Sequence, residues 1–329
     1  MRLSAPPLLR FLGRRLLHGF VVLVCIAILD FLLLHMAPGD AAEILAGEAG
    51  GGDATYVAQL RAQFGLDQPL YKQLGHYLLR LAQLDLGWSA RNNMSVAQLL
   101  MSRLPATLLL MVAAITLAVV AGAALGTLAA RRVNSPTDNV IAVFSLLSYA
   151  TPLFWLGLML IVLFSVTLRW LPTGGMESVG AGLTGWARVS DIAAHAVLPT
   201  ITLGLFYMAV YTRLVRASVL EVKEMDYVRM ARAKGLSAAR VTLRHVFRNA
   251  MLPMVTMLGV QVGSLLGGAV VVEMVFSWPG LGRLAFDAVL ARDLNLLLGI
   301  VLASAVLVIV INIAVDLLYA RLDPRIEVR

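Results

Sequence analysis

The chain carries few side chains that could catalyse a reaction or bind a metal ion. Its five histidines, His18, His35, His76, His195 and His245, are scattered and do not follow a metal-ligand spacing. It contains no G-x-x-x-x-G-K-[ST] loop, the motif that cradles ATP phosphates. No nucleophile is paired with a base in a recognisable motif. We therefore expect no catalytic residue, no metal site and no cofactor on this chain.

Polar residues do occur inside long apolar segments, where each needs a partner or a water-filled path. Asp30 lies in the middle of the first apolar run, where a charge costs about 2.5–3.5 kcal/mol on insertion scales. It either faces a pathway or pairs with another helix, and we favour the helix interface. Gln261, Ser264 and Asn312 are candidates to line a pathway, although such residues also bind neighbouring helices.

The densest group of charges is a basic segment near the middle of the chain. Residues 226–253 read DYVRMARAKGLSAARVTLRHVFRNAMLP and contain no acidic residue after Asp226. A loop of this kind can be held against anionic lipid headgroups by its charge alone, which is the simplest interpretation. The cations of the segment are Arg229, Arg232, Lys234, Arg240, Arg244 and Arg248.

The helix-end signals within the basic segment favour a more specific structure. We expect a helix over 220–234, which Gly235 ends in the left-handed conformation. Ser237 can cap a second helix that runs to about Asn249, and Pro253 fits the first turn of the next apolar helix. The product is a helix–turn–helix attached at both ends to apolar helices. Such a lever can pass motion from a soluble partner to the membrane.

The composition of the whole chain is that of an integral membrane protein. Of its 329 residues, 60% are hydrophobic and only 14% are charged, which is more apolar surface than a soluble protein can bury. The net charge of +8 is concentrated in a few segments, and this indicates membrane orientation rather than nucleic-acid binding. The single cysteine, Cys25, excludes an intrachain disulfide.

Six apolar runs are long enough to cross a bilayer. A helix needs about 20 residues to span the hydrocarbon core, and backbone groups there must hydrogen-bond internally. Pro152 interrupts the third run, so we expect that helix to be tilted or kinked. The runs are 19–37, 106–130, 140–168, 196–214, 251–272 and 296–318.

Lys and Arg gather at alternate ends of these runs, which orients them by the positive-inside rule. We predict an all-α protein with six transmembrane helices and both termini in the cytoplasm. A basic start and a short apolar core at 10–34 also resemble a signal peptide, but no small-x-small cleavage site follows, so we favour a retained helix. The expected parts are a cytoplasmic segment 1–18, a first span 19–37, a periplasmic helical segment 38–105, a core 106–318 with its loop 220–250, and a cytoplasmic tail 319–329.

The external segment between the first two spans has its own helix signals. Asp53 can cap a short helix that ends near Phe64 at Gly65. Pro69, after Asp67, can start a second helix. Ser95 can cap the helix that leads into the second span. The second helix has one leucine face, formed by Leu70, Leu74, Leu78 and Leu81.

Small residues mark two further places near the fifth run. Pro279, Gly280 and Gly282 predict a tight turn after it, with Trp278 at the membrane interface. That turn either receives an external protein or only covers the spans. Within the run, close helix packing is the preferred role of Gly263, Gly267 and Gly268.

Seven segments, in order, give the chain a family resemblance. It resembles the permease subunits of binding-protein-dependent ABC importers, in the dipeptide, oligopeptide and nickel branch. The similar segments are FLLLHMAPGD (31–40), LRAQFGLDQPLYKQLGHYLLRLAQLDLGWS (60–89), RLPATLLL (103–110), TPLFWLGLMLIVLFSVTLRWLPTGG (151–175), the basic segment 226–253, VVVEMVFSWPGLGRLAFDAVLARDLN (270–295) and LDPR (322–325).

The resemblance implies a role for the basic segment, because the family's cytoplasmic loop contains a coupling helix that docks on an ATPase subunit. The general importer motif begins with Glu-Ala-Ala, whereas Arg229, Met230 and Ala231 stand here, a departure usual in the peptide branch. The residues implied in ATPase coupling are Asp226, Tyr227, Arg229, Ala231, Arg232, Ala233, Lys234, Gly235, Leu236 and Ser237.

The resemblance also implies the partners and the location. The chain is expected in the bacterial inner membrane as half of a pathway for peptides or a related small solute. Expected partners are a second, homologous permease, two cytoplasmic ATPases that carry ATP and Mg²⁺, a periplasmic or lipid-anchored binding protein, and membrane lipid. A nickel-chelate importer stays open within the same family. A self-contained secondary transporter or channel is the rival class, but it would often show two related halves, which we do not find. A membrane scaffold without transport is a third class.

Overall fold

We describe a computed structural model of the chain at residues 5–36, 55, 58, 67–89 and 91–322. The described part is almost entirely helical and divides into two compact units, which we take in turn. The larger unit comprises Ser102–Phe286 and the chain from Val308 onward. The smaller unit comprises Ala5–Met101 and Asp287–Leu307.

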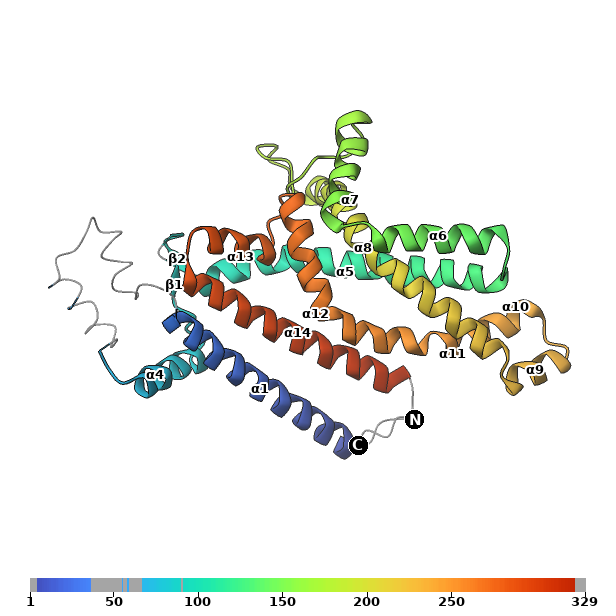
Figure 1. The fold of residues 1–329 in the computed structure, drawn as a ribbon, viewed down its shortest axis with the longest axis horizontal. Helices are drawn as coiled ribbons and strands as arrows, with labels where there is room; N and C mark the ends of the chain where they lie inside the picture. Colours follow the sequence, from blue (N-terminus) through green and yellow to red (C-terminus); the bar gives the residue numbers. More distant parts are fainter. Residues whose placement is uncertain (1–4, 37–54, 56–57, 59–66, 90, 323–329) are drawn as a thin grey trace. The chain divides into compact units, whose positions relative to one another are not determined.

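The elements keep the labels of Figure 1 throughout. In chain order they are α1 (Ala5–Met36), α4 (Leu70–Ala82), β1 (Trp88–Ser89), β2 (Met94–Ser95), α5 (Val96–Arg131), α6 (Pro136–Ala150), α7 (Leu153–Leu160), the π-helix η1 (Ile161–Thr167), α8 (Gly185–Lys223), α9 (Asp226–Ala233), α10 (Ala238–Arg240), the π-helix η2 (Val241–Phe247), α11 (Arg248–Ala250), α12 (Leu252–Val275), α13 (Leu281–Leu290) and α14 (Leu294–Leu322).

The described residues of the predicted apolar runs lie almost wholly in helices, and the third run is interrupted at Thr151 and Pro152. Among the described residues, five helical segments are long and apolar enough to cross a membrane, and the number is six if the bent pair of α6 with α7 and η1 forms one span. Most helices extend beyond the apolar runs, as α8 does, because a helix continues into polar solvent wherever its ends are capped or packed. The helical, multi-span fold class is therefore confirmed.

The third apolar run bends far more sharply than a proline kink usually does. The axes of α6 and of α7 with η1 differ by 106°, and Figure 1 shows α7 turning away from α6. Thr151, which precedes the proline, has ψ 127°, and Pro152 itself has ψ 134°. Two successive residues are thus extended, the first because Pro152 disfavours the helical conformation of its predecessor. The expected kink is confirmed, and the helix breaks there completely.

In the larger unit, α5 and α8 lie in unusually close contact over small residues. A Cβ atom placed on Gly126 would lie 2.5 Å from the carbonyl oxygen of Thr212, and one on Gly122 would lie 2.6 Å from Cβ of Tyr211. Gly204 on α8 lies against α5 in the same way, with the carbonyl oxygen of Ala114 3.2 Å from its Cβ position. Backbones approach this closely in membranes only where small residues face each other.

In the smaller unit, α1 packs against the external helix α4. His35 Nε2 lies 2.9 Å from Gln73 Oε1, and the rings of Phe31 and Tyr77 are 5.9 Å apart. The helix predicted from Pro69 is therefore confirmed, although Pro69 precedes its first residue. The helix predicted between Asp53 and Phe64 lies outside the described residues.

The chain after α4 contains a small sheet. β1 and β2 form a two-residue antiparallel pair, with Trp88 opposite Ser95 and Ser89 opposite Met94. Ser89 donates a hydrogen bond to Asp293, so this pair is fastened to the start of α14. Ser95 caps α5 as predicted, since its Oγ accepts from the backbone N–H of Gln98 at 3.3 Å.

Candidate coupling site and pathway residues

The basic segment folds as a helix, a left-handed turn and a second helix. Gly235 has φ +74°, so it ends α9 in the conformation predicted for it. Ser237 is the N-cap residue of α10, but its side chain makes no capping hydrogen bond. Pro253 lies in the first turn of α12. These local features are confirmed, apart from the Ser237 cap.

Two details of the basic segment differ from the prediction. The helix expected over 220–234 is broken, because α8 ends at Lys223 and α9 begins at Asp226. Met225, just before α9, is extended with ψ 143°. The second helix contains the π-helix η2, which is wound more widely than an α-helix. The amino-acid composition of the segment does not predict this irregularity.

α9 has one buried face and one exposed face. Val228 and Ala231, three residues apart, are buried, and α9 contacts both α8 and η2. Asn249 Nδ2 donates to Tyr227 Oη at 2.9 Å, which ties α9 to α11. Met230 on the opposite side is 58% exposed. The helix is therefore held by its chain neighbours and leaves one face free of this chain.

The exposed face of the turn carries the charge of the predicted coupling residues. Arg229 donates to Glu224 at 3.1 Å, and both side chains are mostly exposed, so this ion pair adds little stability. Ala231 faces inward and Leu236 is half-buried. The predicted residues that reach solvent are Asp226, Tyr227, Arg229, Arg232, Ala233, Lys234, Gly235 and Ser237.

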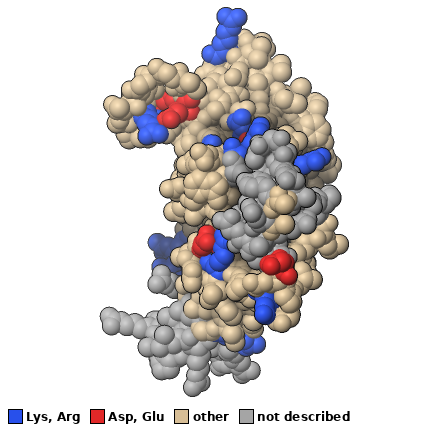
Figure 2. All heavy atoms as spheres, turned by 90° about the vertical axis from the view of Figure 1, so that its left-hand side faces the viewer, with Lys and Arg blue, Asp and Glu red and all other residues tan. Residues whose placement is uncertain are grey.

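Figure 2 shows how different another face of the molecule is. On that face most described atoms are uncharged, and Lys, Arg, Asp and Glu appear singly or in small groups of both signs. Within the basic segment, by contrast, no acidic residue follows Asp226.

The candidate pathway residues of α12 point in different directions. Gln261 is buried, and its Oε1 has no hydrogen-bond partner among the described residues. Ser264, three residues later, is exposed. It belongs to a continuous exposed stripe along α12, which consists of Pro253, Thr256, Val260, Gly263, Ser264, Gly267 and Val271.

The glycines of α12 divide between the two sides in the same way. Gly268 packs against Leu203 and Leu153, as predicted. The Cβ positions of Gly263 and Gly267 meet no atom of the described chain within 4 Å. Close packing at these two glycines therefore stays a prediction, which a helix of another subunit would have to meet.

Asp30 and Asn312 both face other helices. Asp30 is 1% exposed in the smaller unit, and its Oδ2 has no hydrogen-bond partner among the described residues. Burial, with a smaller effect from the Asp30 charge, raises the pKa of Tyr77 on α4 to about 12. In the larger unit, Asn312 Oδ1 lies 3.8 Å from the Cβ position of Gly259. Both positions favour helix interfaces.

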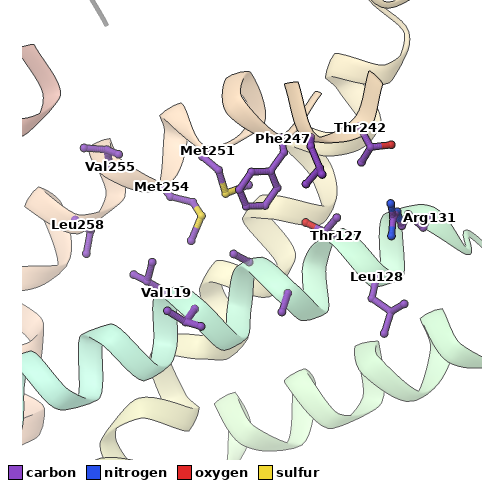
Figure 3. Close-up of a pocket in the computed structure, with 14 residues that line it drawn as sticks. Val119, Thr127, Leu128, Arg131, Thr242, Phe247, Met251, Met254, Val255 and Leu258 are labelled. Carbon is purple, nitrogen blue, oxygen red and sulfur yellow. The ribbon is translucent and has the colours of Figure 1, made fainter. Parts of the chain in front are cut away.

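We call the helical stretch from α10 to α11 (238–250) the second arm of the basic segment. An apolar groove of about 690 Å³ lies between α5 on one side and the second arm with the start of α12 on the other. Figure 3 shows Val119 and Leu128 of α5 on one side and Phe247 and Met254 on the other. Few polar side chains line it, and a solute site needs polar groups placed to orient its ligand. We therefore do not assign the groove to a peptide, whose backbone and charged ends need such partners.

Glu273 is a buried residue that the sequence analysis missed. It is fully buried near the end of α12 and accepts three hydrogen bonds. Thr107 Oγ1 donates to its Oε1 at 2.7 Å, and the backbone N–H groups of Gly282 and Arg283 donate to its Oε2 at 2.8 and 3.1 Å. An acidic residue directly after the fifth apolar run was the available signal.

The turn around Glu273 also corrects the placement of Trp278. That residue is fully buried, and its Nε1 donates to the carbonyl oxygen of Ala106 at 2.8 Å, so the predicted position at the membrane interface is wrong. The tight turn itself is present, and Gly280 is required in it, because the Glu273 carboxylate lies 2.1 Å from its Cβ position. The helix α13 follows, which was not predicted.

Comparison with known proteins gives family matches along nearly the whole chain. Residues 122–328 match the family described as binding-protein-dependent transport system inner membrane component, and residues 8–111 match the N-terminal part of such membrane components. The dipeptide transport system permease protein DppB of Escherichia coli K12 is 41% identical, with 97% of this chain and 99% of that protein aligned. The glutathione transport system permease protein GsiC of the same strain is 42% identical over the same shares.

A solved structure agrees at the level of the fold. The MetNI methionine ABC transporter in an inward-facing conformation matches with a TM-score of 0.56 and 16% identity, over 69% of this chain and 97% of that chain. From the family matches and the two relatives, the chain belongs to the inner-membrane components of binding-protein-dependent transport systems, as an ABC importer permease of the dipeptide and oligopeptide branch.

Proposed function

We propose that this permease conducts short peptides or peptide-like solutes into the cell. The support comes from the two relatives, because their names assign dipeptides to one and glutathione, itself a peptide, to the other. No ATP-binding loop occurs in the chain, so the energy of transport comes from separate ATPase subunits. A binding protein delivers the solute from outside.

The exposed face of α9 is the proposed ATPase-docking surface, and this observation carries the mechanism. α9 is short and basic, and its buried residues are Val228 and Ala231. It is held between α8 and η2, so a push on α9 reaches the helices that cross the membrane. Closing of the ATPases on ATP then shifts the spans between outward and inward access.

A second, homologous permease completes the pathway in this proposal. The exposed stripe of α12, which includes Ser264, faces that partner or the solute. The bent pair of α6 with α7 and η1 counts as one broken span, which gives six spans and two cytoplasmic termini. The basic ends of the chain support this orientation.

Purification from the native host tests the assembly. A tagged chain extracted in mild detergent should retain two ATPases and a second permease. A secondary transporter, a channel or a scaffold would come without ATPases. Reconstituted in vesicles with the binding protein and ATP, the complex should import radiolabelled dipeptides. Retention of the ATPases without any peptide import would refute the solute class alone.

Two substitutions at Gly235 test the docking lever. Its Cβ position meets no atom of the described residues within 4 Å, so a side chain fits there and the strain lies in the backbone conformation. Valine at φ +74° costs about 1–2 kcal/mol, whereas asparagine tolerates this conformation. Gly235→Val should lower import and solute-stimulated ATP hydrolysis together, and Gly235→Asn should not.

A charge variant separates the lever from a simple lipid anchor. Arg244 is exposed on the second arm, so Arg244→Gln should be milder than Gly235→Val. If charge alone holds the segment to anionic lipid, Arg244→Gln is the more harmful change and Gly235→Val is tolerated. Normal coupling in Gly235→Val would contradict the lever.

A further inference from the structure

Three residues tie the turn between α5 and α6 to α8. Arg216 on α8 donates from Nε to Asp138 Oδ1 and from Nη2 to Asp138 Oδ2, both at 2.8 Å. Asp138 is buried in the first turn of α6, where its Oδ2 also accepts from the backbone N–H of Asn134 at 3.0 Å. Lys223 Nζ donates to the carbonyl oxygen of Ala130 near the end of α5. We call Asp138, Arg216 and Lys223 the inner clamp.

The inner clamp uses the chemistry of both helix ends that it joins. The N-terminus of α6 favours a carboxylate, and the last carbonyls of α5 lack intrahelical donors and favour a cation. Asp138 and Lys223 supply these groups. The forked, planar guanidinium of Arg216 fixes the orientation of Asp138 as well as its distance, because two parallel hydrogen bonds permit little rotation.

The position of the clamp along the chain points to coupling. Lys223 is the last residue of α8, and only Glu224 and Met225 separate it from α9. Figure 1 shows α9 at the same end of the larger unit as the turn between α5 and α6. The clamp therefore lies where displacement of α9 enters the membrane helices.

The packing on the two sides of α5 is unequal. Toward α8, the backbones touch at Gly122 and Gly126. Toward α12 and the second arm of the basic segment, the open groove of Figure 3 separates the helices. α5, α6 and α8 are thus joined as one block, and the second arm is less closely attached to α5.

We propose that Asp138, Arg216 and Lys223 are positioning residues for transport, which make α5, α6 and α8 move with α9 as one rigid body. This proposal rests on the proposed docking of α9 on an ATPase. Without the clamp, α8 bends or slides against the turn between α5 and α6 when α9 is pushed. ATP is then hydrolysed with less movement of the spans.

The number of peptides imported per ATP hydrolysed measures this role. A variant that only lowers stability would leave that ratio unchanged in the complexes that remain folded. In vesicles, Asp138→Asn and Arg216→Gln should each import about fivefold fewer peptides per ATP hydrolysed, or fewer still. The double variant should be no worse than the worse single variant, because both changes break the same pair. The control is Arg132→Gln, an exposed cation in the same turn whose side chain donates to Thr137 of α6.

Distance measurements test the rigid body directly in the assembled complex. Cys25 is the only cysteine, so a Cys25→Ser background accepts spin labels at Val140 on α6 and Glu221 near the end of α8, both exposed and both outside the docking surface. The distance between these labels should be the same without nucleotide and with ATP bound. In Arg216→Gln it should broaden or change between the two states.

The outcomes separate the clamp from the proposed function. A label distance that changes on ATP binding in the otherwise unchanged chain overturns the clamp, as do unchanged peptide-to-ATP ratios in Asp138→Asn and Arg216→Gln. Absence of ATPases from the purified complex refutes the proposed function instead. Arg132→Gln as harmful as Arg216→Gln would show that only the charge of the turn matters, which also overturns the clamp.

Discussion

Removal of the Glu273 carboxylate should destabilise the larger unit strongly. Glu273 accepts from two backbone N–H groups and from Thr107, and Thr107 in turn accepts from the backbone N–H of Leu281 at 2.8 Å. These atoms lie where the end of α12 and the start of α13 meet Thr107 of α5, and Glu273 and Thr107 are fully buried there. Glu273→Ala deletes the acceptor and leaves its donors in a site that is closed to water.

The magnitude follows from the donors left without partners. Each buried N–H or hydroxyl without an acceptor costs about 1–3 kcal/mol, so the N–H groups of Gly282 and Arg283 together cost roughly 2–6 kcal/mol in Glu273→Ala. The Thr107 hydroxyl loses its acceptor as well, which brings the total for Glu273→Ala to roughly 3–9 kcal/mol. Glu273→Gln keeps one oxygen for the two N–H groups and turns its amide toward Thr107, so only the Thr107 hydroxyl lacks an acceptor, at a cost of about 1–3 kcal/mol.

The assay is the thermal unfolding midpoint of the purified complex in detergent. Glu273→Ala should lower it most, and Glu273→Gln should fall between that variant and the unchanged protein. Glu177→Ala is the control, because Glu177 pairs with Arg188 at 2.7 Å with both side chains about half exposed. A midpoint for Glu273→Ala equal to that of Glu177→Ala would refute the reasoning, as would equal losses in Glu273→Ala and Glu273→Gln.

Two further predictions concern the spans. Asp30→Asn should leave the thermal midpoint equal or higher, because it removes the charge of a carboxylate whose Oδ2 has no donor among the described residues. A clear loss would show that the charge itself is used. In the Cys25→Ser background, cysteines at Arg132 and Arg240 should react only with reagents that reach the cytoplasm, and a cysteine at Gly180 only with external ones. Labelling of Arg132 and Gly180 from the same side would mean that α6 with α7 and η1 forms a re-entrant loop.

Features determined by neighbouring residues were predictable from the sequence. The Ser95 cap, the left-handed Gly235 and the position of Pro253 each depend on the preferences of one residue and the few beside it. The helical apolar runs follow from the absence of water in a bilayer, which leaves the backbone few alternatives.

Features that depend on distant partners were not predictable in this way. Trp278 carries the amphipathic side chain typical of a membrane interface, but its N–H finds the carbonyl oxygen of Ala106, 172 residues earlier, and the residue is buried. Asp138 had a local signal, since it follows Ser135 by three residues as in a capping box. Its partner Arg216 is 78 residues away, and spacing along the chain does not indicate that pairing.

The two faces of α12 explain why its polar residues separate. One side packs against α7 and α8 in the larger unit and holds Gly268 and the buried Gln261. On the other side, the exposure of Val260 is uninformative, because contact with lipid costs an apolar side chain nothing. Gly263 and Gly267 on that side are informative, since small residues gain most where another backbone approaches. The Ser264 hydroxyl beside them donates to the carbonyl oxygen of Gln261 at 2.9 Å and can still accept a hydrogen bond. The exposed stripe is therefore better suited to a second permease or a hydrated solute than to lipid, which favours Ser264 over Gln261 as the residue of the pathway.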